Sequence, residues 1–281
     1  MIKKILKEYL NRLDGYVIKN KSPLFYLKFS KWVLPILTGR MPNKVKFKIE
    51  NNYLICIIQG DQKYYFYNPY RARRYVFGDG FYYTGNSLAR AYQVTNIKID
   101  STDVIVDIGA NVGEFSVWAA RKGAKVYSFE VDPIALNCLI KNTKNYNNIT
   151  IVRKACSDKD GYAKFYLDSN KASSTLLKPS DKTNKLNRKN FHKVQTITLN
   201  KWLESQSINK IRLLKIDAEG YEPEVLKGIG DSITMIDYIT VDASPERNGQ
   251  ETIDDVQCIL KNNGFKCQTR GYYVLGINTL L

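Results

Sequence analysis

The chain has 281 residues, of which 44% are hydrophobic and 12% aromatic, so it can bury a sizeable core and is not a disordered polypeptide. No apolar run approaches the roughly 20 residues that span a bilayer, and the amino terminus shows no secretory signal. Five cysteines are scattered without a C-x-x-C pair, which argues against a disulfide framework and a zinc site. These features favour a cytoplasmic protein.

The net charge of +16 is concentrated near the amino terminus. Residues 1–50 hold twelve lysines and arginines against three acidic residues, an excess of nine positive charges. A local excess indicates a surface for an acidic partner, such as phospholipid head groups, an anionic or lipid-linked glycan, or nucleic acid. A solvated basic face without a partner is the alternative.

The first 84 residues are predicted to form a basic extension that combines helices and strands. Residues 1–14 have helical spacing of apolar side chains, and residues 24–37 mix aromatic residues, leucines and lysines. Both segments suit helices that cover a sheet edge, or helices that rest on an anionic membrane at its cytoplasmic face. Alternating polarity over residues 45–67 predicts a β-meander. We expect a second domain at residues 85–281.

The stretch from Val104 to Asp132 is typical of a nucleotide site in an open α/β sheet. An apolar strand is followed by a tight turn, a helix from Glu114 and a second strand that ends in Glu130. Four residues at alternate positions form the turn, and we assign them to cofactor binding: Asp107, Gly109, Asn111 and Gly113. Glu130 is placed to accept the hydroxyls of a ribose, and Val131 beside it is assigned to the same site.

The turn favours S-adenosylmethionine over a dinucleotide. Its spacing is G-x-x-x-G, whereas dinucleotide sites need glycine at the third and sixth positions, which are Asn111 and Glu114 here. A pyrophosphate would meet the negative charge of Glu114 in the first helical turn. A cationic sulfonium meets no such repulsion. The alternative is an ordinary α/β turn with incidental glycines.

The rest of the chain continues the alternation of strands and helices. A third strand is expected at residues 149–155, with Asp158 beyond it placed to meet an adenine amino group. Residues 168–193 indicate a mobile loop over the site or a simple insertion. Further strands are expected at 194–199, 211–216 and 237–241, helices at 222–227 and 253–262, and a closing hairpin at 265–268 and 272–277. This order predicts a doubly wound, mostly parallel sheet whose last strand is antiparallel.

Four segments together resemble the FkbM family of S-adenosylmethionine-dependent methyltransferases: DIGANVG, FEVDP, TITLNKWL and LLKIDAEGYEPEVLKG. The likeness covers residues 85–281 and implies the class I methyltransferase fold and O-methylation, often of sugar hydroxyls. This sequence departs from the family pattern at Val131, Asn200 and Ala218. The motifs do not specify the acceptor.

Three acidic residues are the candidates for catalysis. Asp217 follows the fourth strand, where ligands of open α/β sheets bind, and we predict that it is the base. Glu219 is predicted to orient the substrate or bind a cation, with capping of the next helix as the alternative. Asp242, after the following strand, can form a cluster with Asp217, and Lys215 can pair with one of these acids. Such a cluster suits Mg²⁺, although we expect no dependence on it.

The predicted function is methyl transfer from S-adenosylmethionine to a hydroxyl of a glycan, glycolipid or secondary metabolite. Methylation of RNA or protein is the second possibility, because of the basic amino terminus. Nucleic acid is the less favoured partner, because the chain has no N-P-P-Y element. A non-catalytic nucleotide-binding scaffold is the third possibility. The acids Asp107, Glu130 and Asp217 argue against it, since a retired site has no need of them.

Overall fold

The computed structural model describes residues 24–25, 27–28, 30–32, 45–50, 54–59, 62–68, 72, 75, 81–167, 174–179 and 190–279. The helix expected at residues 1–14 lies outside this part of the chain, as does most of the loop expected at 168–193. The described positions between 24 and 32 are helical. Leu27 there is fully buried in the same hydrophobic cluster as Val45, which places this segment against the amino-terminal sheet.

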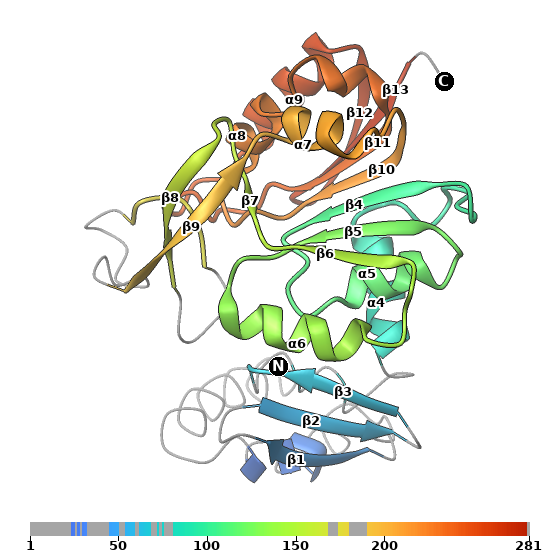
Figure 1. Cartoon of the computed structure of the whole chain (residues 1–281), viewed down its shortest axis with the longest axis vertical. Helices are drawn as coiled ribbons and strands as arrows, with labels where there is room; N and C mark the ends of the chain where they lie inside the picture. The colour runs from blue at the N-terminus through green and yellow to red at the C-terminus, as the bar shows by residue number, and fades with distance from the viewer. Residues whose placement is uncertain are drawn as a thin grey trace, which may run out of the picture.

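A seven-stranded sheet forms the centre of the molecule, in the order β12-β13-β11-β10-β4-β5-β6 (Figure 1). Neighbouring strands from β11 to β6 pair parallel, whereas β13 pairs antiparallel with both β11 and β12. The strands are β4 Val104–Ile108, β5 Lys125–Phe129, β6 Ile149–Val152, β10 Ile211–Ile216, β11 Ile236–Asp242, β12 Phe265–Arg270 and β13 Tyr273–Asn278. The predicted doubly wound sheet is confirmed.

Helices cover both faces of this sheet because its strands are apolar on both sides (Figure 1). One layer holds α4 Phe81–Ala91, α5 Glu114–Ala120 and α6 Pro133–Thr143. The other holds α7 Leu199–Gln206, α8 Glu222–Lys227, the 3₁₀ helix η2 Gly230–Met235 and α9 Ile253–Asn262. Adjacent residues of β4 therefore belong to different cores: Ile105 packs with Trp118 of α5, and Val106 with Trp202 of α7.

Helices α6 and α7 begin at well-formed caps. Asp132 accepts hydrogen bonds from the N–H groups of Ile134 and Ala135, and Pro133 occupies the first turn of α6. Thr198 caps α7 through the N–H of Lys201. These caps fix where the chain turns back from the carboxyl ends of the strands.

The predicted amino-terminal meander is present as a three-stranded antiparallel sheet of β1 Lys46–Glu50, β2 Leu54–Gln59 and β3 Gln62–Phe66. It lies beside α6, on the side of that helix away from the central sheet (Figure 1). Helix α4 runs across residues 84 and 85, where we placed the boundary between two domains. The division at that position stays a prediction.

A second small sheet corrects the predicted third strand. That strand was expected over residues 149–155, but β6 ends at Val152, and Ala155–Cys156 (β7) pairs instead with β9 Phe191–Ile197. Strand β8, Gly161–Tyr166, pairs with the other side of β9. Strand β6 is the edge of the central sheet. After it the chain leaves that sheet and forms a separate three-stranded sheet in the order β7-β9-β8.

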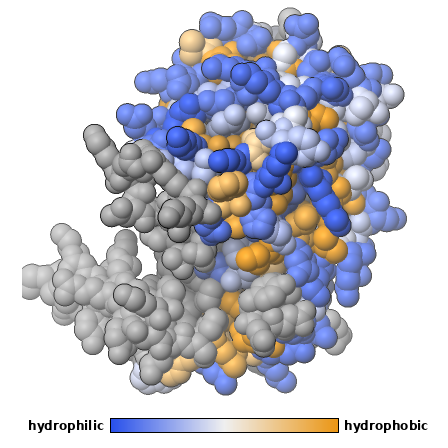
Figure 2. Space-filling view, turned by 60° about the vertical axis from the view of Figure 1, so that its left-hand side comes forward, coloured by the Kyte–Doolittle hydropathy of each residue, from blue (hydrophilic) through white to orange (hydrophobic). Residues whose placement is uncertain are grey.

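The surface is polar with small apolar patches. On the face shown in Figure 2, hydrophilic side chains cover most of the upper half, and hydrophobic ones lie between them toward the middle. Patches of this kind are normal for a folded chain. Across the described ranges, no helix combines the length and the apolar composition that crossing a bilayer requires.

Candidate functional site

A pocket of about 670 Å³, counting the space at its open mouth, lies at the carboxyl ends of the central strands. Of the predicted site residues, it is lined by Gly109, Asn111, Glu130, Val131, Asp217 and Glu219. The predicted cofactor turn and the predicted base therefore face one pocket, although they are about a hundred residues apart in the sequence.

Gly109 allows this convergence. It has φ +72°, and a Cβ atom at this position would lie 1.9 Å from the carbonyl oxygen of Asp217. The N–H of Asp217 donates to the carbonyl of Ile108 at 3.1 Å, which locks the ends of β4 and β10 together. A side chain at residue 109 would push these strand ends apart, so glycine is required for the backbone of Asp217 to reach the turn.

Two residues other than glycine in the pocket have left-handed backbone conformations. Asn111 has φ 51° and Glu219 has φ 53°. Such conformations are disfavoured for residues with a Cβ and are concentrated at functional sites. The side-chain oxygen of Asn111 is buried and has no hydrogen-bond partner among the described residues. It can accept a hydrogen bond from a ligand.

Glu130 ties the turn to the end of β5. One of its carboxylate oxygens accepts from the N–H of Asn111 at 2.7 Å, and the other accepts from Val131 and Asp132 at 2.8 Å each. Burial raises the pKa of Glu130 to about 7, against the opposing effect of these N–H donors. A carboxylate offers about four acceptor positions, so one remains for a ligand hydroxyl.

A buried ion network lies behind Asp217. The ammonium group of Lys215 is 3.1 Å from Asp107 and 3.6 Å from Asp217, and it donates to the carbonyl of Gly109 at 2.9 Å. The Tyr92 hydroxyl donates to the other side of this network, to Asp217 at 2.9 Å. Burial lowers the pKa of Lys215, but the charges of Asp107 and Asp217 outweigh it and raise the pKa overall. The carboxylate of Asp217 is therefore held from two directions.

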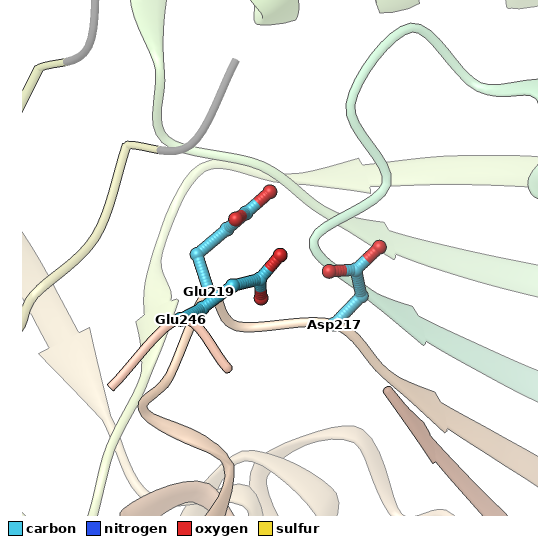
Figure 3. Close-up of side chains that lie close together, drawn as sticks. All are labelled: Asp217, Glu219 and Glu246. Carbon is cyan, nitrogen blue, oxygen red and sulfur yellow. The ribbon is translucent and has the colours of Figure 1, made fainter. Parts of the chain in front are cut away.

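Glu246 joins Asp217 and Glu219 in a cluster of three acids whose carboxylates point toward the same space (Figure 3). One oxygen from each lies within 4.8 Å of the others. Burial, followed by the charge of Asp217, raises the pKa of Glu246 to about 8. Oxygen atoms at this spacing can bind hydroxyl groups of a ligand or a hard cation.

The remaining predicted residues lie around the pocket rather than in its lining. Gly113 has φ 95° and begins α5, where a Cβ would meet Leu139. Asp158 is partly buried and accepts a hydrogen bond from the Ser157 hydroxyl at 3.2 Å. Asp242 is held by Ser244, and burial together with Asp217 raises the pKa of Asp242. Asp107 is fully buried in the ion network.

Glu222 holds the turn before α8, rather than Glu219, which the sequence suggested as an alternative cap of that helix. Glu222 accepts from the N–H groups of Ala218 and Gly220 at 3.1 and 2.9 Å. The N-cap position of α8, Tyr221, makes no side-chain cap hydrogen bond. The structure therefore gives no support to helix capping by Glu219, whose carboxylate lies in the acidic cluster.

Two pocket-side residues were missed in the sequence. Glu246 follows the end of β11, and the argument that selected Asp242 could have been extended to it. Tyr67 follows β3 of the amino-terminal sheet and lines the pocket. The alternating pattern of residues 45–67 predicts the sheet but does not specify which of its side chains reaches the pocket, because that contact depends on how two distant segments pack.

The sheet order, the glycine turn and the pocket at the strand ends are those of a class I methyltransferase fold. The model of the Methyltransferase FkbM domain matches residues 107–267, more than half of the chain. The chain therefore belongs to the FkbM methyltransferase family.

Two curated relatives carry informative names. The chain is 26% identical to the hexuronic acid methyltransferase AglP of Haloferax volcanii over 146 residues, which are 52% of this chain and 57% of AglP. It is 23% identical to the 2-O-methyltransferase NoeI of Sinorhizobium fredii, over 60% of this chain and 75% of NoeI. Its match to AglP thus spans little more than half the length of that relative.

Solved structures resemble the chain only distantly. Magnesium protoporphyrin IX methyltransferase from Synechocystis, solved with bound S-adenosylmethionine, has a TM-score of 0.43 and 15% identity, covering 75% of this chain and 83% of that one.

Proposed function

We propose that this protein transfers a methyl group from S-adenosylmethionine to a hydroxyl of a glycan, a glycolipid or another hydroxylated metabolite. The observation that carries the proposal is that Gly109 and Glu130 line the same pocket as Asp217. A methyl donor held on the glycine turn would thus lie beside a carboxylate that can accept a proton.

The residues of the turn suit this cofactor. The unpartnered side-chain oxygen of Asn111 can accept from an ammonium group, and Glu130 retains a position for a ribose hydroxyl. Gly109 keeps the backbone open to close approach. Asp107 and Gly113 would support the turn from behind, and Val131 would complete its wall. We retain Asp158 as a residue for the adenine end.

The role proposed for the chain in the reaction is alignment and proton removal. The cofactor, when bound, supplies an electrophilic methyl carbon. Asp217 accepts the proton of the acceptor hydroxyl as the hydroxyl oxygen attacks the methyl carbon. Tyr92 and Lys215 keep the Asp217 carboxylate in place. Glu219 and Asp242 orient the acceptor and the base. Positioning is worth about 7–11 kcal/mol in such reactions, and a positioned base adds about 10²–10⁴-fold.

The acceptor class is proposed from the similarity of the chain to AglP, a hexuronic acid methyltransferase, and to NoeI, a 2-O-methyltransferase. The excess of basic residues in the first 50 positions supports a peripheral contact with an anionic membrane or carrier. Most of those residues lie outside the described part of the chain, so this contact and the cytoplasmic location stay proposals. A requirement for Mg²⁺ forms no part of the proposed reaction.

Asp217→Asn tests the proposed base. We expect kcat for methyl transfer to fall about 10²–10⁴-fold, while the dissociation constant for S-adenosylhomocysteine, measured by isothermal titration calorimetry, changes less than about threefold. Asp231→Asn, at an exposed position of η2, is the matched control and should behave as wild type. An Asp217→Asn protein with unchanged turnover would remove the base assignment. A wild-type chain that binds neither S-adenosylmethionine nor S-adenosylhomocysteine would overturn the proposed function.

A further inference from the structure

The amino-terminal sheet contacts the glycine turn of the pocket, and the first contact runs through a buried asparagine. Asn142 of α6 accepts a hydrogen bond from the N–H of Tyr65 at 2.7 Å and donates to the carbonyl of Tyr65 at 2.9 Å. Its amide also donates to the carbonyl of Val112 at 2.8 Å. One side chain therefore joins β3 to the middle of the turn.

The second contact satisfies the acid that begins α5. Glu114 is only 5% exposed, and its carboxylate accepts a hydrogen bond from the hydroxyl of Tyr75. Val112, in the turn, is 1% exposed and belongs to the same hydrophobic cluster as Ile55, Phe66 and Tyr75. The turn thus rests on the core of the amino-terminal segment on this side.

The third contact reaches the pocket itself. Tyr67, directly after β3, lines the pocket, and its hydroxyl accepts a hydrogen bond from the amide of Asn111 at 3.4 Å. Asn111 has the left-handed backbone conformation described above and presents its unpartnered oxygen in the same place. Tyr67 therefore fixes which way the Asn111 amide points.

We propose that the amino-terminal sheet is a working part of the methyl-donor site, in which Asn142 and Tyr75 are positioning residues for the glycine turn and Tyr67 orients Asn111 toward the ligand. The inference rests on the proposed function and goes beyond it, because it assigns a role in cofactor affinity to a segment outside the matched family domain at residues 107–267.

Coupling of this kind acts in both directions. If the sheet holds the turn in its binding conformation, ligand bound on the turn must stabilise the sheet by the same free energy. Hydrogen exchange should therefore slow in residues 54–66 when S-adenosylhomocysteine binds, as well as in residues 109–113. A sheet that only packs beside the domain would gain no more protection than β12, at the far edge of the central sheet.

The test uses the full chain and measures S-adenosylhomocysteine affinity by calorimetry. Tyr67→Phe and Asn142→Ala should each weaken binding about 2–10-fold, the effect of losing one ordinary hydrogen bond. Tyr64→Phe is the control for the first, since its hydroxyl donates to Gln62 at the surface. Asn263→Ala, which loses an exposed bond to the carbonyl of Ile259, is the control for the second. Circular dichroism confirms that each variant is folded.

The outcomes separate this inference from the proposed function. Wild-type affinity in both variants, or ligand protection that stops at the turn, would overturn the inference and leave the methyltransferase assignment intact. Absence of binding by the wild-type chain would overturn the proposed function and the inference with it. Weaker binding in Asn142→Ala supports the inference strongly, because Asn142 does not line the pocket.

Discussion

Asp217 shows how single contacts define the chemistry of a carboxylate. Tyr92 donates to it from the end of α4, and burial, followed by the charge of Asp217, raises the pKa of Tyr92 well above its ordinary value. The phenol therefore keeps its proton at any working pH and acts as a permanent donor. Tyr92 therefore holds the Asp217 carboxylate in position through this hydrogen bond.

Tyr92→Phe should lower kcat about 2–10-fold, since the Asp217 carboxylate loses one of the two groups that hold it. The KM for S-adenosylmethionine should stay unchanged, because Tyr92 does not line the pocket. Steady-state kinetics check both statements. Tyr238→Phe, on β11, is the control. An unchanged kcat in Tyr92→Phe would contradict a positioning role for Tyr92.

Glu246 makes the stability of the protein depend on pH. Its pKa is raised from an ordinary value of 4.5 to about 8, by burial first and then by the charge of Asp217. Between these values the folded chain holds a proton that the unfolded chain releases. The contribution of Glu246 to the free energy of unfolding is therefore fully present below pH 4.5. It is lost as pH rises through 8.

Glu246→Gln should remove this part of the pH dependence, because glutamine does not titrate. From pH 5.5 to 8, the wild-type chain should lose more stability than the variant, by at least ~1 kcal/mol, which corresponds to about 2–4 °C in the unfolding midpoint. Differential scanning fluorimetry at several pH values measures it. Glu130 and Glu222, whose pKa values burial raises to about 7, leave a slope in both proteins. Parallel curves would contradict the assignment.

At the scale of elements, the approach of β4 to β10 depends on one glycine. Gly109→Ala should destabilise the chain and weaken cofactor binding, since the new methyl would collide with the carbonyl of Asp217. Gly271→Ala is a matched control: it has φ +60°, but nothing lies within 4 Å of a Cβ there. The control loses only the backbone preference, about 1 kcal/mol.

Thermal unfolding and titration with S-adenosylhomocysteine measure this comparison. We expect Gly109→Ala to lose at least about 2 kcal/mol more than the control, as overpacking against an unyielding backbone does, and to bind ligand at least about tenfold more weakly. Equal losses in the two variants would show that conformational strain alone explains the need for glycine at residue 109.

The elements were predicted well where the local pattern was strong. Helix α8 and strand β10 have the expected bounds, because a proline and a closing glycine mark the helix, and a run rich in isoleucine and leucine marks the strand. The predicted end of the third strand was wrong, because Ala155 and Cys156 pair with β9 and therefore belong to another sheet. Such a choice depends on a partner forty residues away, which no local pattern specifies.

At the scale of the whole molecule, the described contacts join the amino-terminal sheet to the methyltransferase fold. We therefore expect one cooperative unfolding transition rather than one for residues 1–84 and another for 85–281. Saturation with S-adenosylhomocysteine at a hundred times its dissociation constant should stabilise the chain by about 2.7 kcal/mol. Scanning calorimetry tests this. A second, ligand-insensitive transition would instead support two independent domains.

Local chemistry in the chain was enough to identify the fold class, the glycine turn and the acids at the strand ends. Each of these depends on residues that are close in sequence, or on the rule that parallel strands end at one edge. Packing alone brought Glu246 beside Glu219, directed Asp107 to Lys215 and set Tyr67 against Asn111. These contacts join segments 27, 108 and 44 residues apart, and the folded chain determines them because burial and hydrogen bonding are satisfied for all the elements together.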